Sequence, residues 1–97
     1  MSDFRLSPHA FQDIDSISKH IAQGNLDAAD RLRDEFFDAF EKLAEIPGIG
    51  HLRKDLAAEP LRFWLVYSSY LVIYKPDSHP LEIVRVLHSA RDIKNLL

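Results

Sequence analysis

The order of apolar and polar residues divides the chain into a helical first half and an extended second half. From Pro8 to about Gln23, and again from Leu26 to Glu45, apolar side chains recur every three or four residues. This is the spacing of one face of an α-helix. From Leu61 onward the period falls to about two, which is typical of β-strands. The pattern therefore predicts two helices followed by a sheet.

The ends of the predicted helices carry local signals. Ser7 supplies an N-cap hydroxyl, and Pro8 occupies the first helical position, where its missing N–H costs nothing. Gly24 and Asn25 both tolerate left-handed backbone and end the first helix. So short a turn predicts an antiparallel pair of helices. The predicted buried stripes are Phe11, Ile14, Ile17 and Ile21 in the first helix, and Ala29, Leu32, Phe36, Ala39, Phe40 and Leu43 in the second.

The predicted strands are rich in aromatic and β-branched residues. They run from Asp3 to Ser7, Leu61 to Val66, Tyr70 to Lys75 and Leu81 to Leu87. Short turns join the last three into a meander, and we expect the first strand at its edge. The sequence thus predicts a two-layer α+β fold, β-α-α-β-β-β, with a helical hairpin on one face of a small antiparallel sheet. A short C-terminal helix follows, and residues 1–97 form a single domain.

The composition narrows the possible chemistry. The chain has no cysteine, which excludes disulfides, thiolate metal sites and thiol catalysis and fits a cytoplasmic protein. We predict no signal peptide in Met1 to Arg5 and no membrane contact, because the longest apolar runs fall far short of the ~20 residues that cross a bilayer. The scattered histidines have no ligand spacing with a third donor, so we expect neither a metal nor a cofactor.

The formal net charge of -3 is unevenly distributed. Residues 1–48 contain ten acidic and five basic side chains, a net of -5, whereas residues 49–97 contain five acidic and seven basic ones, a net of +2. Strong binding to nucleic acid by the chain alone is therefore not expected, because it needs clustered cations. A local basic patch in the second half remains compatible with these numbers.

Several short segments occur in a distinctive order. They are Leu6-Ser7-Pro8, Ala28-Ala29-Asp30-Arg31-Leu32, Ile46-Pro47-Gly48-Ile49-Gly50, Leu61-Arg62, Tyr70-Leu71-Val72-Ile73-Tyr74 and Arg85-Val86-Leu87-His88-Ser89-Ala90-Arg91-Asp92. Their order and spacing resemble the RelE/ParE toxin superfamily over nearly the whole chain, and the ParE branch in particular.

The resemblance implies the toxin of a type II toxin–antitoxin system. ParE-like toxins inhibit DNA gyrase by protein contact and arrest growth, and their systems act in plasmid stabilisation. A cognate, ParD-like antitoxin neutralises the toxin within a hetero-oligomer. RelE-like relatives instead cleave messenger RNA in the ribosome. A third possibility is a decayed toxin that only binds an antitoxin.

Three residues at the end of the last predicted strand are the main candidates for a site. Arg85, His88 and Arg91 form a cationic cluster suited to an acidic partner or a polyanion. In a ribonuclease of the RelE kind, His88 would act as acid or base and the arginines would stabilise the phosphate. The structural alternative is that Arg91 and Asp92 anchor the tail while Arg85 pairs with an acid on a neighbouring strand.

The features of this chain favour a toxin that is not an enzyme. Its helical half is acidic, which opposes docking on ribosomal RNA. The segment after His88 also lacks the catalytic tyrosine common in the ribonuclease branch. Ribosome-dependent RNA cleavage stays the second interpretation.

Two further candidate sites each contain an aromatic residue, Trp64 in one and Phe37 in the other. Arg62 and Trp64 lie two apart on one strand and share a face. If Leu61, Phe63 and Leu65 pack under the helices, that face points outward and offers a partner-binding pair. Alternatively, Trp64 covers a second small core beneath the tail and the preceding loop.

Phe37 lies about 120° from the centre of the apolar stripe of the second helix, among acidic residues. An exposed aromatic side chain there is a natural docking point for an antitoxin helix. The alternative is a ring covered by a loop or by contact between two copies of the chain.

Overall fold

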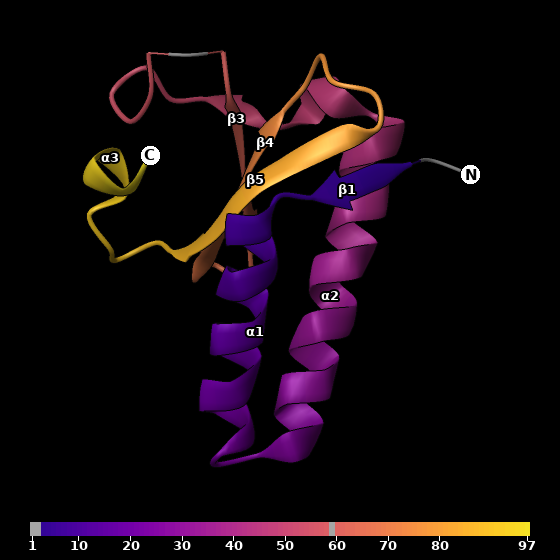
Figure 1. The fold of residues 1–97 in the computed structure, drawn as a ribbon, viewed down its shortest axis with the longest axis vertical. Coiled ribbons are helices and arrows are strands. Elements are labelled where there is room, and N and C mark those ends of the chain that lie inside the picture. The colour runs from indigo at the N-terminus through magenta and orange to yellow at the C-terminus, as the bar shows by residue number, and fades with distance from the viewer. Residues whose placement is uncertain (1–2, 59) are drawn as a thin grey trace.

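Two long helices lie against one face of a five-stranded sheet in the computed structural model of the chain (Figure 1). The structure describes residues 3–58 and 60–97, so Met1 and Ser2, part of the stretch in which we predict no signal peptide, lie outside the described residues. The elements are β1 (Phe4–Leu6), α1 (Pro8–Ala22), α2 (Leu26–Glu45), a 3-10 helix (Pro47–Ile49), β2 (His51–Leu52), β3 (Arg62–Val66), β4 (Tyr70–Lys75), β5 (Leu81–His88) and α3 (Ile93–Leu96). None of the described helices has the length and apolar character of a membrane-spanning segment.

The strand order is β1-β5-β4-β3-β2. The predicted meander of β3, β4 and β5 is confirmed, and so is the place of β1 at its edge. Two details differ from the prediction. β1 pairs with β5 in parallel, which makes the sheet mixed, and β2 adds a second edge strand. β2 escaped prediction because two exposed residues are too few to show an alternation.

Side-chain caps begin both long helices, and the sequence predicted the one at Ser7. The Ser7 hydroxyl accepts a hydrogen bond from the Ala10 N–H at 3.0 Å and donates one to the Val84 carbonyl at 2.7 Å. Ser7 therefore caps α1 and also fixes its start against β5. α1 does end before Gly24 and Asn25, but neither residue adopts the left-handed backbone that was expected. Asn25 is extended and instead caps α2, because its side chain accepts a hydrogen bond from the Ala28 N–H at 3.0 Å.

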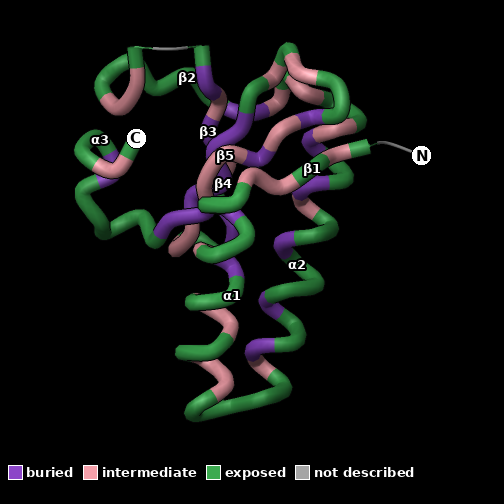
Figure 2. Tube along the Cα trace, in the orientation of Figure 1, coloured by how far each residue is buried: buried purple, intermediate pink, exposed green. Residues whose placement is uncertain are grey.

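Apolar side chains are buried on both faces of the sheet. Figure 2 shows the buried positions along the long helices and the central strands. The larger cluster lies under α1 and α2 and includes Ala10, Ile14, Leu32, Phe36, Phe40, Leu43, Val72, Tyr74, Ile83 and Val86. The second cluster lies on the other face and contains Leu61, Phe63, Leu71, Ile73, Leu87 and, from α3, Ile93. Consecutive residues of β4 are buried as a result, as in strands covered on both sides.

The stripe predicted for α1 is wrong at one position. The Phe11 side chain is 64% exposed, and the neighbouring Ala10 is buried in its place. Ala10 precedes Ile14 by four residues and therefore lies on the same side of the helix, directly above it. Phe11 is rotated away from that side. The stripe predicted for α2 is confirmed.

The Tyr74 side chain organises the segment between α2 and β2. Its hydroxyl donates to the Pro47 carbonyl at 2.6 Å and accepts from the Gly50 N–H at 2.9 Å. Arg62 donates from Nη1 to the Gly50 carbonyl at 2.6 Å. Burial of the ring raises the pKa of the Tyr74 hydroxyl. The hydroxyl of the buried Tyr74 side chain thus fixes the turn from Pro47 to Gly50 through two hydrogen bonds.

The glycine at position 50 is required by this contact. A Cβ atom there would lie within 2.8 Å of Tyr74 Cε1, in addition to meeting the hydroxyl oxygen, whereas a Cβ at Gly48 would have no heavy atom within 4 Å. We therefore predict that Gly50→Ala lowers the free energy of unfolding by about 1–3 kcal/mol. Gly48→Ala, the matched control, should change it by less than about 0.5 kcal/mol. Urea denaturation of both variants measures the difference, and equal losses would contradict the proposed contact.

Candidate functional site

Arg85 connects β5 to the first helix through a bidentate ion pair. Its Nε donates to Asp13 Oδ2 at 2.8 Å, and its Nη2 donates to Asp13 Oδ1 at 2.9 Å. The backbone N–H of Val86 also donates to Asp13 Oδ2, at 3.0 Å. The two charged side chains are only 16% and 11% exposed. Arg85 does pair with an acid, but the acid is on α1 and not on a neighbouring strand.

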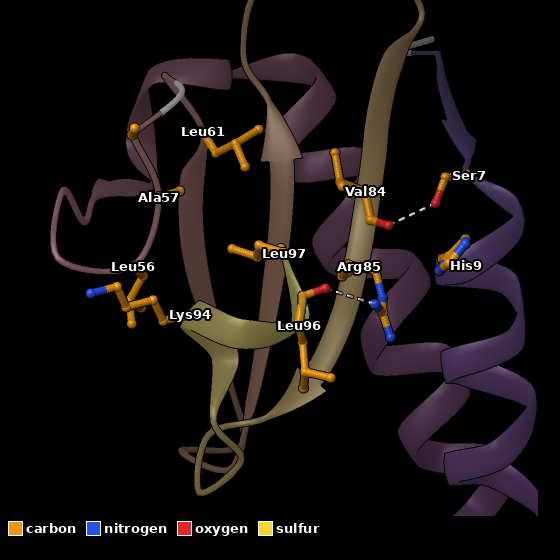
Figure 3. A pocket seen from close by; sticks show the side chains of 11 residues that line it. Ser7, His9, Leu56, Ala57, Leu61, Val84, Arg85, Lys94, Leu96 and Leu97 are labelled. Carbon is orange, nitrogen blue, oxygen red and sulfur yellow. Dashed lines mark hydrogen bonds between the residues drawn. The ribbon is translucent and has the colours of Figure 1, made fainter.

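The remaining guanidinium nitrogen of Arg85 holds the C-terminal tail. Its Nη1 donates to the Leu96 carbonyl at 3.2 Å (Figure 3). The hydrogen bonds to Asp13 raise the pKa of Arg85 further above its usual range. Every nitrogen of this guanidinium therefore donates within the protein. Arg85 is a junction between α1, β5 and the tail.

Figure 3 shows a cavity beside this junction, between the tail on one side and β5 with the start of α1 on the other. Its volume is about 550 Å³. The lining residues are Ser7, His9, Leu56, Ala57, Ala58, Leu61, Val84, Arg85, Lys94, Leu96 and Leu97. Apolar side chains dominate, and the polar groups that reach it are mostly cationic or hydroxylic.

His88, the last residue of β5, and Arg91, in the turn that follows, lie apart from this cavity. His88 is exposed, its Nδ1 accepts a hydrogen bond from the Ala90 N–H at 3.1 Å, and its ring meets Tyr70 edge-on with the centroids 5.4 Å apart. Arg91 is exposed, and its guanidinium has no hydrogen-bond or ion-pair partner in the described part of the chain. The predicted cluster is therefore divided, because Arg85 is engaged inside the fold while the other two face solvent.

The tail is held mainly by its apolar side chains. Ile93 is 4% exposed and belongs to the second apolar cluster. Asp92, expected to anchor the tail together with Arg91, accepts a hydrogen bond from the Asn95 side chain at 2.5 Å. That bond is local to the tail. The anchoring contacts to the rest of the protein come from Ile93 and from the Leu96 carbonyl.

A second cavity, of about 470 Å³, lies on the other side of α3. It is lined by His51, Arg53, Leu56, Phe63, Leu65, Ser68, Leu71, Ser89, Arg91 and Ile93. The sequence pattern had singled out only Arg91 among its polar residues. The basic excess of residues 49–97 was the available signal, but only the fold brings these side chains to one place.

Arg62 and Trp64 share a face, as predicted, but it is the face covered by the helices. Trp64 packs against the larger apolar cluster, with Lys42 Nζ 5.3 Å from its ring centroid and the His51 ring stacked at 6.4 Å. The outward orientation required Leu61 and Phe63 under the helices, and both lie in the second cluster instead. The second small core exists, but Trp64 is not part of it.

Phe37 is partly covered. Its ring lies 5.9 Å from that of Phe4 in β1 and 5.5 Å from that of Phe40, and it remains 36% exposed. It lines a shallow cleft of about 110 Å³ between α1 and α2, together with Leu6, Phe11, Ile14, Asp15, Ser18 and Arg33. The Ser18 hydroxyl is buried there without a hydrogen-bond partner among the described residues. The cover comes from a strand, not from a loop.

Comparisons with known proteins provide an independent measure of similarity. A family model described as "ParE toxin of type II toxin-antitoxin system, parDE" matches residues 4–93. A solved structure described as "Chromosomal ParDE TA system from P. aeruginosa" aligns with a TM-score of 0.71 and 15% sequence identity, over 91% of this chain and 96% of that chain. At this identity the structural match shows the fold alone. No curated protein matches the chain.

The ion pair at the junction can be tested by removing its acid. Asp13→Ala leaves the partly buried Arg85 without a counter-charge, and we predict a loss of about 3–5 kcal/mol in the free energy of unfolding. Asp15 is the matched control, because it lies on the same helix and pairs with Lys19 at the surface at 2.9 Å. Asp15→Ala should cost less than about 1 kcal/mol. Thermal unfolding measures both variants, and equal unfolding temperatures would show that the ion pair contributes little to the stability of the fold.

Proposed function

Because the chain belongs to the ParE toxin family of type II toxin–antitoxin systems, we propose that it arrests growth by binding DNA gyrase and that a cognate antitoxin neutralises it. The observation that carries the proposal is the family match, which spans residues 4–93 and includes every strand and both long helices. The toxin acts in the cytoplasm as a single domain. It is held inactive in a hetero-oligomer with a ParD-like antitoxin.

The geometry of Arg85 favours protein contact over RNA cleavage. A ribonuclease needs cations whose donors are free to meet the phosphate in the transition state. All the guanidinium nitrogens of Arg85 already donate to Asp13 or to Leu96. His88 has its Nδ1 engaged by the Ala90 N–H. Of the three residues suggested for catalysis, Arg91 alone presents a guanidinium without a partner in the described chain.

The cleft between α1 and α2 is the proposed docking site of the antitoxin. Phe11 and Phe37 expose 64% and 36% of their side chains on either side of it, which is unusual for rings that serve the fold alone. An amphipathic helix laid along the cleft would cover both rings. Trp64 and Arg62, engaged under α2, are not part of this surface.

Growth measurements test the toxin assignment. Expression of the chain alone should slow growth and produce signs of replication arrest. Co-expression with the short reading frame beside its gene should restore growth. In vitro, the purified chain should inhibit supercoiling by DNA gyrase, while transcripts in a translation extract stay intact. Normal growth at high soluble expression contradicts the proposal, and transcript cutting that disappears in His88→Ala identifies a ribonuclease instead.

The docking site has its own test. Phe37→Ala should weaken antitoxin binding by about tenfold or more, as expected for a central aromatic anchor. Leu26→Ala is the matched control, because Leu26 is 71% exposed on the same helix but does not line the cleft. Isothermal titration of the two variants measures the affinities. Equal affinities would place the antitoxin elsewhere on the toxin.

A further inference from the structure

The sheet face opposite the long helices is only partly covered. Its cover consists of the four-residue α3 and the turn that contains Leu56. Two cavities flank α3, and Leu56 lines both of them. One is lined by Lys94 and Leu96 from the tail, and the other by Arg91 and Ile93. The two cavities, with α3 between them, are together called the tail groove here.

The ionisable side chains that line the tail groove are all basic ones. His9, Arg85 and Lys94 line the first cavity, and His51, Arg53 and Arg91 line the second. No aspartate or glutamate lines either cavity within the described residues. The basic lining of the groove contrasts with the acidic side chains on the outer side of α2 and with the negative net charge of the whole chain.

Several of these cations are available to a ligand. In the described part of the chain, neither Arg91 nor Lys94 has an ion-pair partner. Arg53 is held by Asp55 at 2.8 Å, but both side chains are well exposed, and such a pair contributes little. A carboxylate from a partner can therefore replace Asp55 at small cost. Arg85 is the exception, because it is committed to Asp13 and Leu96.

The floor of the groove suits aliphatic side chains better than nucleic-acid bases. Leu65 is 48% exposed on the floor of the second cavity, beside Leu71. Single-stranded nucleic acids bind by stacking bases on exposed aromatic rings. Among the phenylalanine, tyrosine and tryptophan side chains of the described chain, only Phe63 lines the groove, and it is 2% exposed and offers no face for stacking. The imidazole of His51 also lines it, but one face of that ring is stacked on Trp64.

We propose that the tail groove binds an acidic peptide segment of a protein partner, anchored by one or two apolar side chains. The carboxylates meet Arg91, Arg53 and Lys94 in charge-assisted hydrogen bonds. The apolar anchors enter the cavities on either side of α3, and Ser68 and Ser89 offer hydroxyls to the peptide backbone. The inference rests on the part of the proposed function that gives this chain a protein partner, and it adds a surface distinct from the helical cleft.

Direct binding of synthetic peptides tests the groove without any growth or gyrase measurement, so its failure leaves the proposed function standing. The probe is a glutamate-rich peptide of about ten residues that carries two leucines, which is long enough to cross the groove in an extended form. Titrated into isotopically labelled protein, it should shift the amide signals of Leu56, Ser68, Ser89 and Arg91 first. The affinity should fall as salt is raised.

Variants with matched controls define the contacts. Arg91→Gln should weaken peptide binding about three- to tenfold, whereas Arg31→Gln, on the exposed side of α2, should leave it unchanged. Leu65→Ala should weaken binding by a similar factor, and Leu52→Ala should not. Leu52 is a fair control, because it is 51% exposed on β2 and lines neither cavity. All four positions are exposed, so the variants should unfold at the temperature of the parent protein.

Three outcomes would overturn the proposal. The first is the absence of signal changes in the groove at millimolar concentrations of the acidic peptide. The second is equal or tighter binding there of a lysine-rich peptide of the same design, or of a short oligothymidine, which would identify a different class of ligand. The third is concentration-dependent shifts at the same amides without peptide, abolished by Arg91→Gln, which would make the acidic helix of a second copy the occupant.

Discussion

The ion pair between Arg85 and Asp13 is the point at which α1, β5 and the C-terminal tail are joined. One carboxylate accepts from two nitrogens of Arg85 and from the backbone of Val86, so its oxygens are satisfied despite their low exposure. The same guanidinium donates to the Leu96 carbonyl. A helix of four residues is not stable alone in water. The tail therefore keeps its place through Arg85 and the buried Ile93 side chain.

This junction also determines which charges are left for partners. Arg85 serves the fold, and the cations that face solvent on this side come from the tail and from the loops, chiefly Arg91, Lys94 and Arg53. The acidic side chains of α2 lie on the other layer. The split between a net of -5 in residues 1–48 and +2 in residues 49–97 thus becomes a difference between two faces of the molecule. Faces of opposite charge can select different partners or different segments of one partner.

The position of the loop cations depends on Tyr74. Its hydroxyl fixes the turn at Pro47 and Gly50, and Arg62 adds a bond to the Gly50 carbonyl. β2 begins immediately after this turn and pairs with β3, which brings His51 beside Phe63 at the edge of the sheet. The second cavity then gathers residues from β2, from the β3–β4 turn and from the tail. A buried phenol in the core thereby positions a charged surface.

Local signals in the sequence were sufficient for the family, for the boundaries of the two long helices and for four of the five strands. Ser7 and Asn25 cap their helices through bonds that span three residues, and such short-range chemistry can be recognised in the sequence. The face of the sheet on which Trp64 lies could not be predicted from the sequence. Side chains of β3 are buried on both faces of the sheet, so their alternation does not show which face the helices cover. Asp13 did carry a signal, since it lies about 40° from Ile17 on the buried side of α1, where an acid needs a partner.

The sequence did not reveal which residue pairs with Asp13. Arg85 lies 72 positions away, and only the packing of α1 on the sheet brings the two together. The same is true of the tail groove, whose cations come from separate loops and strands. The sequence by itself determined the family and most of the elements, because capping, periodicity and motif order are local. The tertiary structure decided which charges are used in the fold and which remain exposed, because ion pairs and cavities depend on distances that no local pattern contains.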